Sequence, residues 1–262
     1  MKRLFLFFLL LISFFVCAQN NVTVLVIDSV TINTSEYLGK DNFDNLYYVA
    51  NNQLYKKKDT KEFYYKNVGL GRLSQISFEN NLQPLLLYSD FNTVVLLDNQ
   101  LNEVQKIDFN TIDPFLKVSC IGFGGQNKIW FFDSITQKFG LYNSINSSII
   151  FISNTQNTEI TKIHSDYNFF YYLDQNNNYS KISIFGKITL LGKLPDYASF
   201  CFLDATKIIY RLDNSLHISN LEDHTTSEIL IKEKSFTNFF FKDGILSIFT
   251  QNKIINYQIN LP

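Results

Sequence analysis

One pattern recurs along the whole chain: an apolar, mostly aromatic run of strand length that ends in Asp or Asn just before a turn. The runs end at Asn51, Asp90, Asp133, Asp174, Asp213 and Asn252. These positions are separated by 39, 43, 41, 39 and 39 residues. Four-stranded propeller blades repeat at about 40 to 50 residues, whereas unrelated strands of a sandwich have no reason to keep a period. The sequence therefore predicts an all-β fold, a β-propeller of six four-stranded antiparallel blades.

The stretch 84–109 shows the unit most clearly, because three apolar runs are separated there by short polar turns. Pro84 can open a strand, since the first residue need not donate a hydrogen bond to the sheet. Asp90 and Asn92 flank one turn, and Asp98 begins the next. Asp and Asn side chains bond to their own backbone in turns, so the stretch is expected to be an up-and-down meander.

The six blades are expected over residues 36–67, 73–109, 117–153, 161–191, 198–232 and 236–259. The last of these has only three strands, while the apolar run 23–29 precedes the first blade as an extra strand. An open ring would expose unpaired strand edges. We therefore expect the N-terminal strand to pair on the outside of the sixth blade and so close the ring.

Residues 1–18 have the pattern of an export signal, with the positive Lys2 and Arg3 before an apolar run that reaches Val16. Val16 and Ala18 suit the cleavage enzyme, so the mature protein is expected to begin at residue 19. Lipidation at Cys17 is the disfavoured alternative, because the preceding residues are a poor lipobox. The prediction is a signal peptide over 1–18 and a single propeller domain over 19–262, with no transmembrane segment. The expected location is exported: periplasmic, associated with the outer membrane, or extracellular.

The charge of the chain argues against a nucleic-acid partner. Losing Lys2 and Arg3 without any acid moves the formal net charge from −1 to −3, whereas nucleic-acid binding requires a basic surface. The run Lys56, Lys57 and Lys58 is the basic cluster of the mature sequence, and we interpret it as a solvated strand or turn face. With 46% hydrophobic and 18% charged residues, the chain is expected to fold and not to be disordered. The mature protein is expected to be a monomer.

Cys120 and Cys201 both lie on expected innermost strands, in the third and fifth blades. A disulfide requires Cα atoms within about 7 Å, and the fourth blade should keep the two further apart. We expect two unbonded, buried and unreactive thiols.

No linear motif for catalysis, cofactor binding or metal binding is present, and no catalytic, cofactor-binding or metal-binding residue is predicted. His164 lies on an expected innermost strand, a position that can face the central channel, although a structural role is the commoner one; His217 and His224 share no evident site with it. Calcium stays open as a cofactor, because Asp and Asn oxygens from several loops can converge. The recurrent Asp residues are better explained as turn formers. The aromatic runs could stack on a carbohydrate, but buried strands between packed blades account for them better.

With this repeat, the chain resembles a group of small exported bacterial β-propeller proteins without assigned activity. The resemblance is strongest in NFDNLYYVANNQLYKKKD and in LSQISFENNLQPLLLYSDFNTVVLLDNQLNEV. More distantly, the expected blade count resembles six-bladed NHL-type and TolB-type propellers. These motifs are structural, so the resemblance implies a fold and transfers no catalytic residue.

Three hypotheses for the function remain open. The favoured one is a non-enzymatic binding or scaffold protein of the cell envelope, which presents the propeller to a protein partner. The second is a propeller hydrolase or lyase with a calcium ion or an acid pair centred in the channel. The third is a glycan or small-ligand binder that uses aromatic residues at the channel mouth. Converging acids and histidines at one mouth would favour the enzyme, and a channel plugged by Phe and Leu would favour the scaffold.

Overall fold

The structure is a computed structural model, which describes residues 22–32, 34, 36–41, 43–195, 197, 199–204 and 206–259. The export signal expected over residues 1–18 lies outside the described residues. Within them, four antiparallel sheets of four strands stand separately, and one sheet has eight strands.

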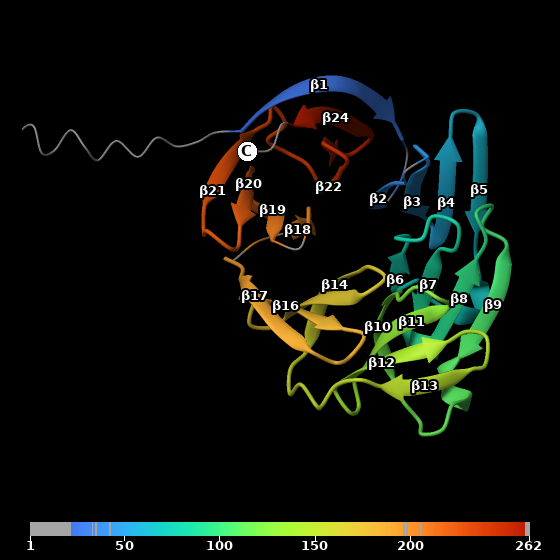
Figure 1. Cartoon of the computed structure of the whole chain (residues 1–262). Coiled ribbons are helices and arrows are strands. Elements are labelled where there is room, and N and C mark those ends of the chain that lie inside the picture. The colour runs from blue at the N-terminus through green and yellow to red at the C-terminus, as the bar shows by residue number, and fades with distance from the viewer. Residues whose placement is uncertain are drawn as a thin grey trace, which may run out of the picture.

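The separate sheets follow one another along the chain, and each begins with its innermost strand (Figure 1). The first contains β2 (Glu36–Lys40), β3 (Leu46–Ala50), β4 (Gln53–Lys58) and β5 (Lys61–Tyr65). The second contains β6 (Gln75–Ser77), β7 (Leu85–Tyr88), β8 (Thr93–Leu97) and β9 (Glu103–Asp108). The third contains β10 (Val118–Phe123), β11 (Lys128–Asp133), β12 (Lys138–Asn143) and β13 (Ser148–Phe151). The fourth contains β14 (Ile160–Ser165), β15 (Phe169–Asp174), β16 (Asn178–Ser183) and β17 (Ile188–Lys193). The 3₁₀ helices η1 (Val68–Leu70), η2 (Ser89–Phe91) and η3 (Phe109–Thr111) lie in the connections.

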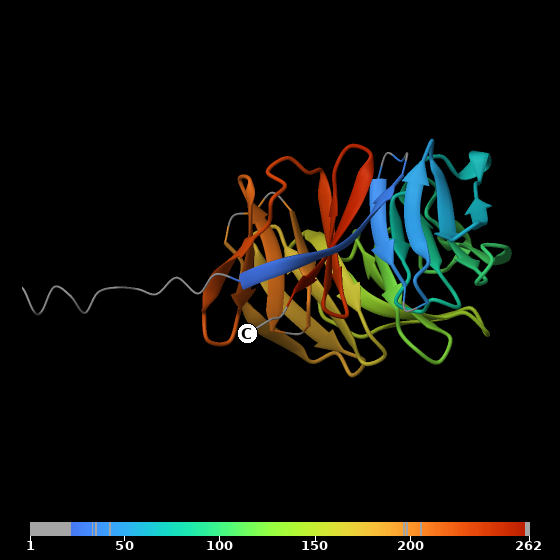
Figure 2. The same ribbon diagram turned by 90° about the horizontal axis from the view of Figure 1, so that it is seen from above.

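The eight-stranded sheet joins two groups of strands through the N-terminal strand β1 (Val22–Thr31). One group is β18 (Ser199–Phe202), β19 (Lys207–Leu212), β20 (Ser215–Asn220) and β21 (Thr226–Leu230). The other group is β22 (Asn238–Lys242), β23 (Ile245–Phe249) and β24 (Lys253–Ile259). Figure 2 shows β1 crossing the outside of the molecule between these groups.

The pairing of β1 corrects one part of the sequence prediction and confirms another. Val24 to Thr31 pair antiparallel with β24, as expected for a strand that completes the last group. Val22 and Thr23 also pair with Ile229 and Leu230 of β21, and this second pairing is parallel. Six separate sheets are therefore not present, because β1 is long enough to bond to the outer strands of both groups. The prediction of separate four-stranded blades holds for four of them.

Apolar clusters lie between successive sheets. Tyr47 and Leu54 of the first sheet pack with Leu86 and Val95 of the second, and equivalent clusters follow around the molecule. Continuous aromatic runs such as β11 are almost fully buried, because both faces of the sheet are covered. The expectation that these runs form core is confirmed for β11 and β15, whereas Phe240 and Phe241 of β22 are only partly buried.

The first sheet also packs against the last strands of the chain. Tyr37 and Tyr48 share a buried cluster with Phe249 and Ile254. At the inner end of this boundary, Gly39 adopts a φ of 137°, and a Cβ atom there would lie 2.8 Å from the ring of Phe240. The absence of a side chain at Gly39 thus lets β22 lie directly against β2.

One turn geometry recurs at Asp98 and Asp174, where Asp residues were expected to form turns, and also at Asp41. In each, the Asp carboxylate accepts hydrogen bonds from the backbone N–H groups two and four residues later and from the Asn side chain four residues later. The turns are Asp41–Asn45, Asp98–Asn102 and Asp174–Asn178. The residue before the Asn has a positive φ in all of them. The interpretation of Asp residues as turn formers is confirmed for Asp98 and Asp174.

The lysine run on β4 is only partly a solvated face. Lys56 is buried, its Nζ atom donates to the carbonyl of Asn99 over 2.8 Å, and it lies 3.8 Å from the buried carboxylate of Asp41. Burial lowers the pKa of Lys56, and Asp41 opposes that shift. Lys56 therefore ties the first sheet to a turn of the second, which the sequence pattern did not predict.

Candidate functional site

Polar and aromatic side chains around the central axis line a hollow that we call the channel mouth. It lies where the innermost strands β6, β10, β14, β18 and β22 end, and its volume is about 560 Å³. Its aromatic wall is made by Phe78, Phe123, Tyr167, Phe200, Phe202, Phe240 and Phe241. Its polar groups are Glu79, Lys162, His164, Ser165, Asp166, Lys242 and Asp243.

Aromatic rings meet across one side of this hollow. Tyr47 stacks on Phe78 with ring centroids 5.1 Å apart, and Phe78 lies 6.2 Å from Phe240. The rings come from β3, from the end of β6 and from β22, so the row spans three parts of the ring of strands. Gly39 makes the row possible, because a side chain there would occupy the space of the Phe240 ring.

Tyr167 is an exposed aromatic residue with a defined position at the rim. Its side chain is 65% exposed, yet its ring packs edge-on against Phe123 at 5.3 Å. Gly125 lies directly under it, since a Cβ atom at Gly125 would come within 2.4 Å of the Tyr167 ring. A large exposed ring with a fixed support is the type of residue that contributes most to binding interfaces.

His164 and Glu79 face each other across the channel mouth. The Nδ1 atom of His164 lies 3.8 Å from Oε1 of Glu79, and the two residues come from the fourth and second sheets. Glu79 also accepts a hydrogen bond from the hydroxyl of Ser77. Since the carboxylate stands between Ser77 and His164, the imidazole is not placed to deprotonate this serine, and the group is not a nucleophilic triad.

Two ammonium groups at the mouth have no hydrogen bond or ion pair with any residue that the structure describes: those of Lys162 and Lys242. Burial lowers the pKa of Lys242, while Asp243 and Asp41 oppose that shift. By contrast, Asp166 is engaged, because it accepts hydrogen bonds from the N–H groups of Asn168 and Phe169. The mouth thus offers charges of both signs beside its aromatic wall.

The two cysteines are free, as the sequence predicted, and lie on the innermost strands β10 and β18. Cys120 is buried. Cys201 is only partly buried and lines the channel mouth, so the prediction of two core thiols was right for Cys120 alone. Burial raises the pKa of Cys120 to about 11 and that of Cys201 to about 12, which keeps both as thiols at neutral pH.

The histidines occupy three different places. His164 lines the channel mouth, which its position on an innermost strand had left open. His217 stacks on Tyr210 within the eight-stranded sheet, and His224 lies in a turn with a positive φ.

In the described part of the chain, no group of three or more His, Cys, Asp or Glu side chains is arranged to hold a metal ion. No helix within that part is long and apolar enough to cross a membrane.

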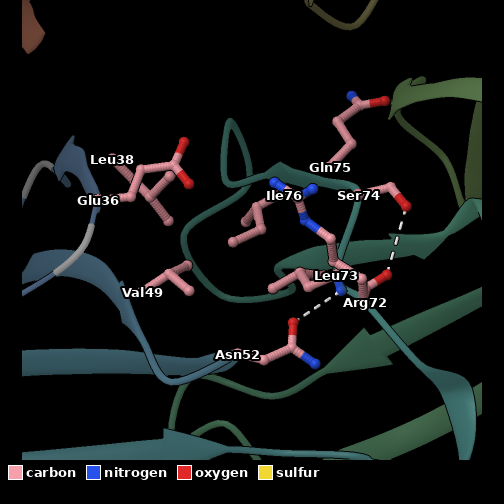
Figure 3. A pocket seen from close by; sticks show the side chains of 9 residues that line it. All are labelled: Glu36, Leu38, Val49, Asn52, Arg72, Leu73, Ser74, Gln75 and Ile76. Atoms are coloured by element: carbon pink, nitrogen blue, oxygen red, sulfur yellow. Dashed lines mark hydrogen bonds between the residues drawn. The ribbon is translucent and has the colours of Figure 1, made fainter.

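A second hollow opens at the other end of β6, where this strand begins (Figure 3). Its volume is about 580 Å³. It is lined by Glu36, Leu38, Val49, Asn52, Arg72, Leu73, Ser74, Gln75 and Ile76. Ile76 lines both hollows and so stands between them.

The sequence left open that His164 faces the channel, but it gave no sign of the partner Glu79 or of the second hollow. Glu79 and His164 are far apart in the sequence, and only the ring arrangement brings them together. No local pattern marks Arg72 or Glu36 either, because an exposed charged residue beside a strand is ordinary.

Comparisons with known proteins define the fold. No protein-family model matches the chain, and no curated protein is significantly similar to it in sequence. Among solved structures, virginiamycin B lyase from Staphylococcus aureus is similar with a TM-score of 0.58 and 12% identity, over 92% of this chain and 95% of the lyase. The β-propeller domain of Cps50 (Swd1) from Myceliophteria thermophila gives a TM-score of 0.61 and 8% identity, over 90% of this chain and 100% of that domain.

A member of the DUF4221 family from Bacteroides vulgatus is similar with a TM-score of 0.58 and 10% identity, over 92% of this chain and 99% of that protein. At these identities the likeness concerns the fold alone. Together with the four-stranded sheets around a common centre, it shows that the chain is a β-propeller protein.

Proposed function

We propose that the protein is a non-enzymatic binding protein of the cell envelope, which presents its propeller to a protein partner and receives that partner at the channel mouth. The observation that carries this proposal is the mouth itself, with Tyr167 held on Phe123 and Gly125 and with Lys162 and Lys242 unpaired among the described residues. Large aromatic residues and unengaged cations are groups that a partner can bury and pair.

The sequence pattern of residues 1–18, which is that of an export signal, supports a location outside the cytoplasm, and residues 19–262 would then form one monomeric propeller domain. We also propose that the eight-stranded sheet supplies the fifth and sixth blades of a six-bladed ring, with β1 as the closing strand. This count is supported by the pairing of β1 with β24 and by the packing of Tyr37 and Phe249 across the boundary between the first and last strands.

The test compares two exposed aromatic residues in a pull-down from envelope fractions. Tyr167 lies at the mouth, whereas Phe185 is 90% exposed in the turn between β16 and β17 and serves as the matched control. A partner should be retained by the native protein and by Phe185→Ala, and retention by Tyr167→Ala should fall by about tenfold, the effect of losing one interface anchor. Equal retention by the two variants would remove the channel mouth from the interface.

A second candidate function is a lyase or hydrolase that acts at the same mouth, where Glu79 and His164 converge as expected for an enzyme. It is favoured by the 3.8 Å approach of Glu79 Oε1 to His164 Nδ1, because a carboxylate on Nδ1 leaves Nε2 free to accept a proton. The similarity to virginiamycin B lyase is compatible with it but concerns the fold. Incubation with a panel of cyclic esters and with quinupristin, which is present in one similar lyase structure, tests this candidate. Turnover that is lost in His164→Ala would support it, and no turnover of any panel member would leave the binding function in place.

A further inference from the structure

The hollow at the start of β6 is a separate site from the channel mouth, and its floor is apolar. Leu38 and Val49 come from the first sheet, and Leu73 and Ile76 come from the segment that enters the second sheet and from β6. All four side chains are only partly buried. They form an apolar surface that a ligand of suitable size could cover, since cavities of about 300 to 1,000 Å³ are typical of small-molecule sites.

Hydrogen bonds hold the walls of this hollow in place. The side chain of Asn52 donates to the carbonyl of Gly71 over 2.7 Å and accepts from the N–H of Leu73 over 3.0 Å. Gln75 donates to and accepts from the backbone of Ile121 on β10, over 2.6 and 3.0 Å. The polar groups of the frame are therefore used within the protein, and the shape of the hollow is largely formed before any ligand arrives.

Two charged side chains of opposite sign stand at the rim without such engagement. Glu36 is exposed on β2, and Arg72 is exposed before β6, so they flank the apolar floor from its two sides (Figure 3). Neither side chain has a hydrogen bond or an ion pair with any residue in the described ranges. In particular, they form no ion pair with each other.

We propose that this hollow binds a short peptide with free termini and an apolar side chain between them. The terminal carboxylate lies on the guanidinium of Arg72, which presents paired N–H donors in the geometry that a carboxylate accepts. The terminal ammonium lies on the carboxylate of Glu36. The apolar side chain covers Leu38, Val49 and Ile76. This site is independent of the function proposed for the channel mouth.

Titration calorimetry with the tripeptide Ala-Leu-Ala tests the proposal when it is paired with two blocked forms, one acetylated at the amine and one amidated at the carboxyl end. Each block should weaken binding by about tenfold, the factor for one charge-assisted hydrogen bond partly open to solvent. In Glu36→Gln acetylation should no longer matter, and in Arg72→Met amidation should no longer matter. Matched charge controls are Glu222→Gln and Lys253→Met, which lie on exposed turns or strands of the eight-stranded sheet and should keep both effects.

Each blocked end of the peptide is matched to one variant, so the calorimetry tests the contacts with Glu36 and with Arg72 separately. Absence of binding by the native protein overturns the proposal, and so does a blocked-end effect that persists unchanged in both variants. A Tm equal to that of the native protein shows that the fold of each variant is intact. Because Tyr167→Ala leaves this hollow untouched, it should bind the tripeptide as the native protein does, and the two proposals fail separately.

Discussion

Replacing Gly39 by Ala tests the contact by which the last strands of the chain meet the first sheet. Two penalties apply at this position. The φ of 137° belongs to a region that residues with a side chain rarely adopt, and such a conformation costs about 1–3 kcal/mol. The new Cβ atom would also lie 2.8 Å from the Phe240 ring, and overpacking costs about 1–3 kcal/mol when the neighbour cannot move.

The backbone penalty is the firmer of the two, because Phe240 lines the channel mouth and its ring can shift toward that space. A total loss of about 3 kcal/mol in the free energy of unfolding is therefore the expected value. For a domain of this size, each kcal/mol lowers Tm by about 2–4 °C. We expect Gly39→Ala to unfold about 6–12 °C below the native protein in a scan followed by circular dichroism.

Gly69→Ala is the matched control, since Gly69 lies in η1 and its added Cβ would meet only Asn67 Oδ1 at 3.5 Å. Its Tm should stay within about 3 °C of the native value, because the altered unfolded-state entropy contributes less than about 1 kcal/mol. In a Phe240→Ala background the overlap is removed, so Gly39→Ala should cost less there while the backbone part persists. An unchanged Tm for Gly39→Ala alone would refute the direct packing of β22 on β2.

Three further measurements follow from the same structure. Deleting Val22–Thr31 removes the strand pairing with both β24 and β21 and the buried Val22 side chain. At about 1 kcal/mol for each of several lost hydrogen bonds, the Tm should fall by at least about 6 °C. An unchanged Tm would contradict the bridging role of β1. Thiol titration in denaturant without reductant should find Cys120 and Cys201 both free in the mature chain, and a mass lighter by two hydrogens would show a bond instead. Intact mass of the exported form should correspond to a chain that begins at Gln19, whereas a lipid adduct at Cys17 would reverse that expectation.

Local patterns in the sequence were enough to predict the strands. The sheet from β2 to β5 falls within the blade expected over 36–67, and the strands β22 to β24 lie within 236–259. The turns were predictable for the same reason, because an Asp carboxylate satisfies backbone N–H groups only two and four residues away. Asp98 and Asn102 illustrate this, since every bond that shapes their turn is local. Such interactions depend on neighbouring residues and leave a signal in the linear sequence.

The position of Lys56 could not be predicted from local sequence patterns. As one member of a lysine run it resembled a solvated face, but its ammonium is buried against Asn99 and Asp41. Whether a charged side chain reaches water or a partner depends on what the next sheet places beside it. The sequence pattern around Lys56 contains no information on that distance.

Only the tertiary structure decided how the sheets are joined and where the candidate sites lie. The parallel pairing of β1 with β21 depends on the end of one blade coming beside the start of the chain, which periodicity alone does not encode. His164 and Glu79 come within 3.8 Å of each other, and Glu36 and Arg72 come to line one hollow, because strands from different sheets converge around one axis. The sequence repeat determined the strands and turns, because these depend on hydrogen bonds and side-chain contacts between neighbouring residues. The sites depend instead on the angles and distances between sheets whose residues are remote in the sequence.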